Sequence, residues 1–260
     1  MTKDAVEIQR NHFNHISKRY IESRSGKNHL AYKEVLWRFI LKRLAKTLPP
    51  KVHIRGLEAM CGNAEASKRI VDFFPNVTMH ASDLSDAMAA AAGKIGEDRI
   101  TISQGDILKL DQKEIYDLIV VIGGLHHIPS NVQKGLHNIH NALKKGGIFL
   151  NLEPTHNNLL FKSVRERIYR TNSIFEENSE RAFNLKEYHQ YLADNKFHII
   201  YQLHPGLLGY ILYYNPDAFP GLNIGTPGIA KLMARMDIFL GRSFIGKFFS
   251  FATWVIAEKK

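Results

Sequence analysis

The sequence predicts an α/β fold in which a seven-stranded, mostly parallel sheet carries helices on both faces. Two observations lead to this fold class. After Pro49-Pro50, short apolar segments alternate with segments long enough for crossover helices, which is the pattern of a parallel sheet. The first apolar segment runs into a turn centred on Gly62, as expected where a strand passes directly into a helix.

Residues 1–50 are expected to form a helical cap. Between Leu30 and Leu48, apolar side chains recur at the spacing of one helix face, and most Lys and Arg residues lie elsewhere. Pro49-Pro50 ends this helix, because proline lacks a backbone N–H and clashes with the preceding turn.

The core is expected to be Rossmann-like and to consist of residues 51–204 and 251–260 of a single domain, 1–260. Strands are predicted over 52–57, 77–81, 100–103, 118–122, 148–152, 197–203 and 251–257, and helices over 85–92 and 132–143. The remaining residues, 205–250, are mostly apolar with Gly and Pro between the apolar runs. An insertion of this length is typical of a lid or a binding element.

Composition excludes several classes of protein. A hydrophobic fraction of 45% excludes disorder of the whole chain, and no run of apolar residues is long enough to predict a transmembrane helix. The N-terminus lacks the apolar segment of a secretory signal, and one cysteine excludes an internal disulfide, so we expect a cytoplasmic protein. The net charge of +10 favours an anionic partner: nucleic acid, a membrane surface or an acidic substrate.

Acidic residues follow the predicted strands at positions that suit a nucleoside. Glu58 and Gly62 belong to the first strand and its turn, and Asp83 ends the second strand, where an acid can accept both hydroxyls of a ribose. The third strand leads to Asp106-Ile107, a carboxylate and an apolar side chain that could hold an adenine. Together these elements predict a nucleoside-containing cofactor, and the absence of G-x-G-x-x-G weighs against a nicotinamide dehydrogenase.

In this combination of motifs, residues 52–152 resemble the class I S-adenosylmethionine-dependent methyltransferases. Met60 and Ala64 depart from the family pattern, because they stand where its turn usually has its first and third glycines. The resemblance implies methyl transfer as the reaction, S-adenosyl-L-methionine as the cofactor and no metal. It implies cofactor contacts by Tyr20, Glu58, Met60, Gly62, Asp83, Leu84, Asp106, Ile107 and Gly123.

Two adjacent histidines are the candidate catalytic residues. His126 and His127 follow the fourth strand, where methyl transfer takes place in this family, and an imidazole there could take a proton from the acceptor. The alternative is that they bond the loop backbone. His137 and His140 are spaced i, i+3 on a helix without a nearby carboxylate or cysteine in sequence, so we expect no metal there.

The acceptor site is expected at the insertion and at the N-terminus. Tyr210, Tyr213 and Tyr214 could line a pocket for a flat or hydrophobic acceptor, or else pack in the core, and His15 is a further candidate. Residues 229–249 form a basic amphipathic pattern, which fits a lid helix packed on the core or transient contact with a membrane surface. The apolar side of its first helix consists of Ile229, Leu232, Met233, Met236, Phe239 and Leu240.

The sequence therefore predicts a methyltransferase for a small, hydrophobic or aromatic acceptor, with oxygen, nitrogen or carbon as the methylated atom. An RNA methyltransferase is the alternative suggested by the basic charge, but the dispersed Lys and Arg residues weigh against nucleic acid as a partner. A protein that binds S-adenosylmethionine without transferring methyl groups is the second alternative.

Overall fold

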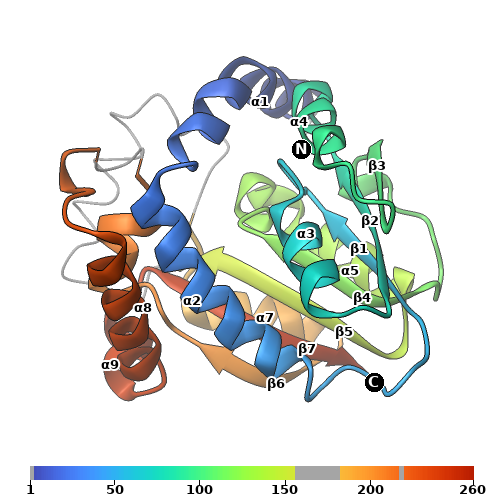
Figure 1. Ribbon diagram of the computed structural model, residues 1–260. Helices are drawn as coiled ribbons and strands as arrows, with labels where there is room; N and C mark the ends of the chain where they lie inside the picture. Colours follow the sequence, from blue (N-terminus) through green and yellow to red (C-terminus); the bar gives the residue numbers. More distant parts are fainter. Residues whose placement is uncertain (1–2, 156–181, 217–219) are drawn as a thin grey trace.

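The computed structural model describes residues 3–155, 182–216 and 220–260. A seven-stranded sheet runs through the molecule in the order β3-β2-β1-β4-β5-β7-β6 (Figure 1). β7 is antiparallel to both of its neighbours, and the other pairs are parallel, as predicted. The strands are β1 (Ile54–Ala59), β2 (Val77–Asp83), β3 (Ile100–Gln104), β4 (Tyr116–Ile122), β5 (Leu143–Pro154), β6 (Phe197–Leu203) and β7 (Ala252–Lys259).

Helices cover both faces of the sheet because the central strands are apolar on both sides. In β4, Leu118 and Val120 face the helices α2 and α3, while Ile119 and Val121 face α5 and α7. The described helices are α1 (Lys3–Ser23), α2 (Lys27–Leu44), α3 (Glu65–Phe73), α4 (Asp86–Ala92), α5 (Val132–Ala142), α7 (Leu185–Asp194), α8 (Pro227–Gly241) and α9 (Phe244–Phe249). None of them is long and apolar enough to cross a membrane.

The predicted N-terminal cap consists of two helices with different roles. α2 packs along the sheet with Tyr32, Trp37 and Ile40 buried, so it is a layer of the core. α1 lies above the carboxyl ends of the strands, next to α4 (Figure 1). The Asn14 side chain fixes it there, because its oxygen accepts hydrogen bonds from the Ser85 hydroxyl at 2.6 Å and the Ala87 N–H at 3.2 Å.

The insertion between β6 and β7 packs on α2 with a side that the sequence analysis did not predict. Small residues of α8, Ala230 and Ala234, are buried against the core, and the carboxylate of Asp237 is buried with them. This carboxylate accepts hydrogen bonds from the Tyr32 hydroxyl and the Tyr210 N–H, both at 2.8 Å. The small side chains and this buried polar contact determine which side packs inward.

The expected packing of the apolar side of α8 on the core is therefore wrong for most of its residues. Ile229, Leu232, Met236 and Phe239 are exposed, while Met233 and Leu240 are half-buried. α9 continues the pattern with exposed Phe244, Phe248 and Phe249.

Candidate active site

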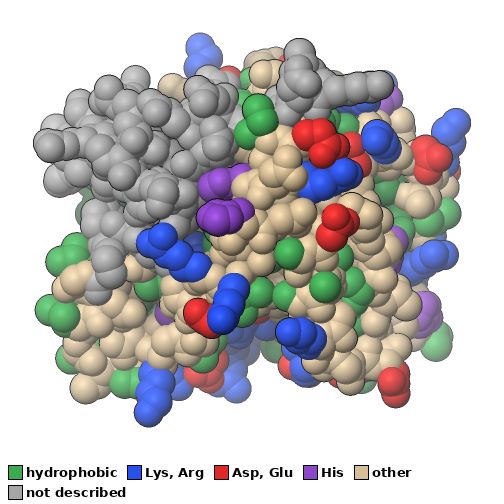
Figure 2. All heavy atoms as spheres, turned by 90° about the horizontal axis from the view of Figure 1, so that it is seen from above, with side chains coloured by type: hydrophobic (Ala, Val, Ile, Leu, Met, Phe, Trp, Pro, Cys, Tyr) green, Lys and Arg blue, Asp and Glu red, His purple; other side chains and the backbone are tan. Residues whose placement is uncertain are grey.

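A cavity of about 470 Å³ lies at the carboxyl ends of the strands from β1 to β5. Seen from above, the molecule exposes histidine, basic, acidic and apolar side chains on this face (Figure 2). α1, the first turns of α2 and the start of the insertion also contribute to its lining. All nine predicted cofactor residues line this one cavity, together with His126, His127, Tyr210 and Tyr214. Its size lies within the ~300–1,000 Å³ typical of small-molecule sites.

Glu58, near the end of β1, is a buried carboxylate on the cavity wall. It accepts a hydrogen bond at 2.6 Å from the backbone N–H of Ser67, in the first turn of α3. Burial raises the pKa of Glu58 to about 7, although the hydrogen bond from Ser67 works in the opposite direction. A buried acid with so high a pKa is suited to a cationic ligand, which would favour its ionised form.

The turn after β1 keeps a glycine-like backbone despite its two departures from the family pattern. Met60, Gly62 and Ala64 all adopt a left-handed conformation, with φ between 55° and 56°. This conformation costs a residue with a side chain roughly 1–2 kcal/mol. The Gly62 N–H donates to Asp83 at 2.7 Å. Met60 and Ala64 therefore preserve the shape of the turn.

The carboxylates of Asp83 and Asp106 each accept backbone hydrogen bonds in a turn at the end of a strand. Asp83 accepts hydrogen bonds from the N–H groups of Gly62 and Ser85, and burial raises its pKa. Asp106 caps the short helical turn that follows β3 by accepting from the Leu108 N–H at 2.9 Å. Both acids line the cavity beside Leu84 and Ile107.

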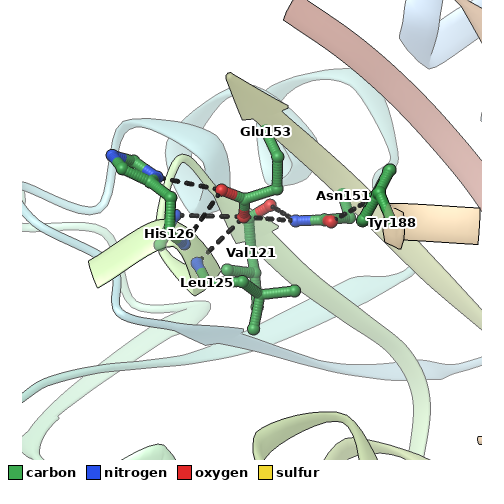
Figure 3. Close-up of polar contacts among 7 residues, drawn as sticks. Val121, Leu125, His126, Asn151, Glu153 and Tyr188 are labelled. Carbon is green, nitrogen blue, oxygen red and sulfur yellow. Dashed lines mark hydrogen bonds and ion pairs between the residues drawn. The ribbon is translucent and has the colours of Figure 1, made fainter. Parts of the chain in front are cut away.

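Glu153 of β5 holds the loop that carries the two histidines (Figure 3). Its carboxylate accepts hydrogen bonds from the N–H groups of Gly124 at 3.2 Å, Leu125 at 2.9 Å and His126 at 3.3 Å. It also contacts the Nδ1 atom of His126 at 2.9 Å. Because this carboxylate already accepts three backbone N–H groups, we assign the proton of the contact to Nδ1, and Nε2 is then the basic nitrogen of the ring.

Asn151, also on β5, extends this network into the core. Its side-chain N–H groups donate to the Val121 carbonyl at 2.7 Å and to Glu153 at 3.0 Å, and its oxygen accepts from the Tyr188 hydroxyl. Sequence analysis missed Glu153 and Asn151. The available signal was two polar residues, two positions apart, in the otherwise apolar residues 148–154 of the strand. Such residues share one side of the strand.

The two histidines have different surroundings, although their rings lie 4.0 Å apart. His126 has Glu153 as its ring partner. The His127 ring packs edge-on against Phe13 of α1, with ring centres 5.0 Å apart. Burial raises the pKa of Asp83, and the nearby His127 partly offsets this rise. His127 therefore lies on the Asp83 side of the cavity.

The predicted acceptor residues separate into two groups. The rings of Tyr210 and Tyr214 stack at 4.6 Å and line the cavity with Ile211. Tyr213 is buried beside Tyr32 and its hydroxyl donates to the Ile224 carbonyl, so it belongs to the core and is not among the cavity residues. His15 is on the exposed side of α1 and does not line the cavity either.

Sequence analysis also missed a basic group at the α1–α2 junction. Lys33 forms a buried ion pair with Glu65, while the Arg24 guanidinium lies 3.6 Å from the centre of the Tyr20 ring. Burial disfavours ionisation of Glu65, but Lys33 outweighs this effect together with Arg69 and lowers the pKa of Glu65 to about 2. Arg24 and Lys33 both line the cavity, and neither belongs to a motif. Within the described parts of the chain, no group of three metal-ligating residues occurs.

Comparison with known proteins identifies the kind of domain. Residues 57–149 match a family model described as a methyltransferase domain. A malonyl-(acyl-carrier protein) O-methyltransferase from Bacillus cytotoxicus is 33% identical over 84 residues, which are 32% of this chain and 30% of that protein. The chain thus matches less than a third of this relative's length.

Two solved structures share the fold. One is a SAM-dependent methyltransferase from Thermotoga maritima, described as a possible histamine N-methyltransferase, with a TM-score of 0.62, 15% identity and coverage of 96% of this chain and 99% of the other. The second is a geranyl diphosphate methyltransferase in complex with GPP and sinefungin, with a TM-score of 0.60, 16% identity and coverage of 86% and 78%. At these identities the likeness shows the fold.

Proposed function

We propose that this chain, which carries a methyltransferase domain of the class I S-adenosylmethionine-dependent family, methylates a small acceptor that is hydrophobic or aromatic. The observation that carries the proposal is the shared cavity. The cavity extends along the edge of the sheet. Asp106 and Asp83 line it at β3 and β2, Glu58 lines it at β1, and His126 lines it after β4 with Tyr210 and Tyr214 nearby in its lining. One cavity can therefore accommodate a nucleoside cofactor and an acceptor side by side.

The donors and acceptors of the cavity fit S-adenosyl-L-methionine. Asp83 and Asp106 suit the ribose and adenine, and the buried carboxylate of Glu58 suits a cationic methionine end. Lys33 of α2 and Arg24, in the turn between α1 and α2, suit the methionine carboxylate. When bound, the cofactor supplies an electrophilic methyl group on a sulfonium.

The acceptor side is apolar and flat. The stacked rings of Tyr210 and Tyr214 lie there with Ile211, and Phe13 of α1 also lines the cavity. Aromatic walls of this kind suit a ring or an apolar chain, and they exclude water from the reacting atoms. The start of the insertion would thus close the acceptor side of the cavity.

We assign the general base to His126 and a positioning role to Glu153. Because Nδ1 donates to Glu153, Nε2 can take a proton from an acceptor hydroxyl, amine or acidic carbon. The carboxylate also stabilises the imidazolium that results. By bonding three consecutive N–H groups, it keeps the loop from moving, and such fixed geometry accounts for much of the rate in a transfer reaction.

The experiment is incubation of the protein with cell extract and tritium-labelled S-adenosyl-L-methionine, followed by separation of organic-soluble material, protein and RNA. Label in the organic phase is the expected result. Label in RNA alone would overturn the small-acceptor assignment. Cofactor binding without label in any fraction would favour a protein that does not methylate.

Variants of the histidine loop test the mechanism. His126→Ala should slow transfer by about 10²- to 10⁴-fold with unchanged binding of S-adenosylhomocysteine, whereas His137→Ala, on the exposed side of α5, should leave the rate unchanged. Glu153→Gln should move the acidic limb of the pH–rate profile to lower pH, because the imidazolium loses its carboxylate and His126 then stays deprotonated in more acidic solution. An unchanged rate in His126→Ala would refute the base, and an unchanged profile in Glu153→Gln would refute the positioning role.

A further inference from the structure

α8 and α9 present a large apolar surface at the outer edge of the molecule (Figure 1). Phe239, Phe244 and Phe248 are 74%, 70% and 58% exposed. Isolated exposed apolar residues are common, but a group of large ones on two adjacent helices marks an interaction site. We call this group the apolar surface; its members are Ile229, Leu232, Met236, Phe239, Phe244, Phe248 and Phe249.

The apolar surface is a consequence of how tightly the two helices pack on their inner side. A Cβ atom added to Gly241 would lie 2.6 Å from the His204 carbonyl oxygen, and one on Gly246 would lie 2.4 Å from Gly241 itself. Small residues therefore seat α8 against the core and α9 against the end of α8. The large side chains have no room on that side and remain outside.

The charged side chains that α8 and α9 themselves expose are all basic. Lys231, Arg235, Arg242 and Lys247 lie between its members, and the only acid in residues 220–250 is Asp237. Asp237 is buried and bonded to Tyr32, so it does not offset these charges at the surface. Lys231 pairs with Glu34 of α2 at 2.8 Å, which leaves the exposed Arg235, Arg242 and Lys247 to set the potential.

We propose that α8 and α9 dock on the surface of an anionic lipid bilayer. Exposed phenylalanines and leucines can enter the boundary between headgroups and acyl chains, while Arg and Lys beside them contact lipid phosphates. A second copy of the chain fits less well, because a two-fold contact would set the same cations against each other. Docking is independent of the methyl-transfer proposal, since it needs neither cofactor nor acceptor.

The test is sedimentation of the full chain with vesicles of phosphatidylcholine mixed with phosphatidylglycerol, compared with phosphatidylcholine alone. The wild type should bind the anionic vesicles and be released by salt. Arg235→Gln with Lys247→Gln should bind about 25-fold more weakly, at about fivefold for each cation. The control pair Lys94→Gln and Lys134→Gln makes the same charge change next to α4 and on α5, and it should bind like the wild type.

A second set of variants tests insertion into the bilayer. Phe239→Ser with Phe244→Ser and Phe248→Ser should abolish vesicle binding while the thermal midpoint and S-adenosylhomocysteine binding stay unchanged, because these side chains are exposed. Phe239→Trp should show a shift of its emission to shorter wavelength when anionic vesicles are added.

Three results would overturn the proposal. The first is absence of wild-type binding to anionic vesicles, and the second is equal binding by the triple serine variant. The third is concentration-dependent self-association or RNA binding that the same variants abolish, without any binding to vesicles. That result would assign the apolar surface to another copy of the chain or to nucleic acid.

Discussion

Replacing Glu58 by Gln is expected to stabilise the cofactor-free protein above neutral pH and to leave its stability unchanged in acid. Burial raises the pKa of Glu58 from 4.5 to about 7. A carboxyl group whose pKa is raised on folding contributes stability below its unfolded pKa, and this contribution is lost as the pH rises through the folded value. The wild type should therefore lose stability between pH 4.5 and pH 7 on account of this residue.

The size of the effect follows from the shift. A difference of 2.5 pKa units at 1.36 kcal/mol per unit corresponds to about 3 kcal/mol. For a chain of this length, ~1 kcal/mol moves the thermal midpoint by roughly 2–4 °C, so Glu58→Gln should raise it by roughly 6–12 °C at pH 8. Gln can keep the hydrogen bond from the Ser67 N–H, because its amide oxygen also accepts.

Thermal unfolding at pH 5 and pH 8 measures this effect, with Glu22→Gln on the exposed side of α1 as the control. Calorimetry with S-adenosylhomocysteine completes the test, because its cationic amine should favour ionised Glu58. Wild-type affinity should rise as the pH approaches 7, and the variant should bind more weakly without this pH dependence. A variant that is destabilised equally at both pH values would show that Glu58 is ionised throughout, and the reasoning would fail.

Four further substitutions test other parts of the structure. Asp83→Asn should weaken S-adenosylhomocysteine binding by about 10- to 100-fold in calorimetry, since hydrogen bonds to a charged group contribute ~1.5–3 kcal/mol each; unchanged affinity would refute the ribose assignment. In urea titrations, Ala64→Gly should raise the free energy of unfolding by about 1 kcal/mol, and Gly62→Ala should lower it by a similar amount, because both positions have φ 55°. A Cβ atom at Gly62 would meet no atom within 4 Å, so the loss would come from the backbone conformation alone. Tyr32→Phe should lower the free energy of unfolding by ~1–3 kcal/mol, and more at pH 8 than at pH 5. Burial raises the pKa of Asp237 to about 6, so the carboxylate needs the Tyr32 hydroxyl mainly above that pH; an equal loss at both pH values would contradict this reasoning.

The sheet, and the position of the predicted cofactor residues at one edge of it, could be predicted from sequence because the signals are local. β4 is apolar at every position from Leu118 to Ile122, which requires burial on both faces, and all seven predicted strands occur. Their boundaries differ mainly at β5, which starts at Leu143 because the chain continues in extended form through Gly146-Gly147 after α5. Glu58, Asp83 and Asp106 lie at or just after strand ends, and parallel topology brings such ends together at one edge.

The histidine loop could be predicted only in part. The sequence placed His126 after the fourth strand, but its partner Glu153 is 27 residues further along the chain. The pairing of β4 with β5 brings the two together, and no pattern near His126 specifies it. The tertiary structure was needed to distinguish His126, bonded to Glu153, from His127, packed on Phe13.

The insertion shows most clearly what the sequence by itself could not determine. An amphipathic pattern gives the difference between two sides of a helix, but it does not say which side packs inward. In α8, the side that packs inward carries Ala230, Ala234 and Asp237. Tyr32, 205 residues away from Asp237 in sequence, donates the hydrogen bond that allows this carboxylate to be buried. Similarly, Tyr210, Tyr213 and Tyr214 would share one side of an α-helix, but they lie in a π-helical turn with Tyr213 in the core and the other two on the cavity. Local propensity thus determined the helices, the strands and the turns at the strand ends. Contacts between distant segments decided which side chains line the cavity and which remain exposed, because burial depends on the partner that a side chain meets.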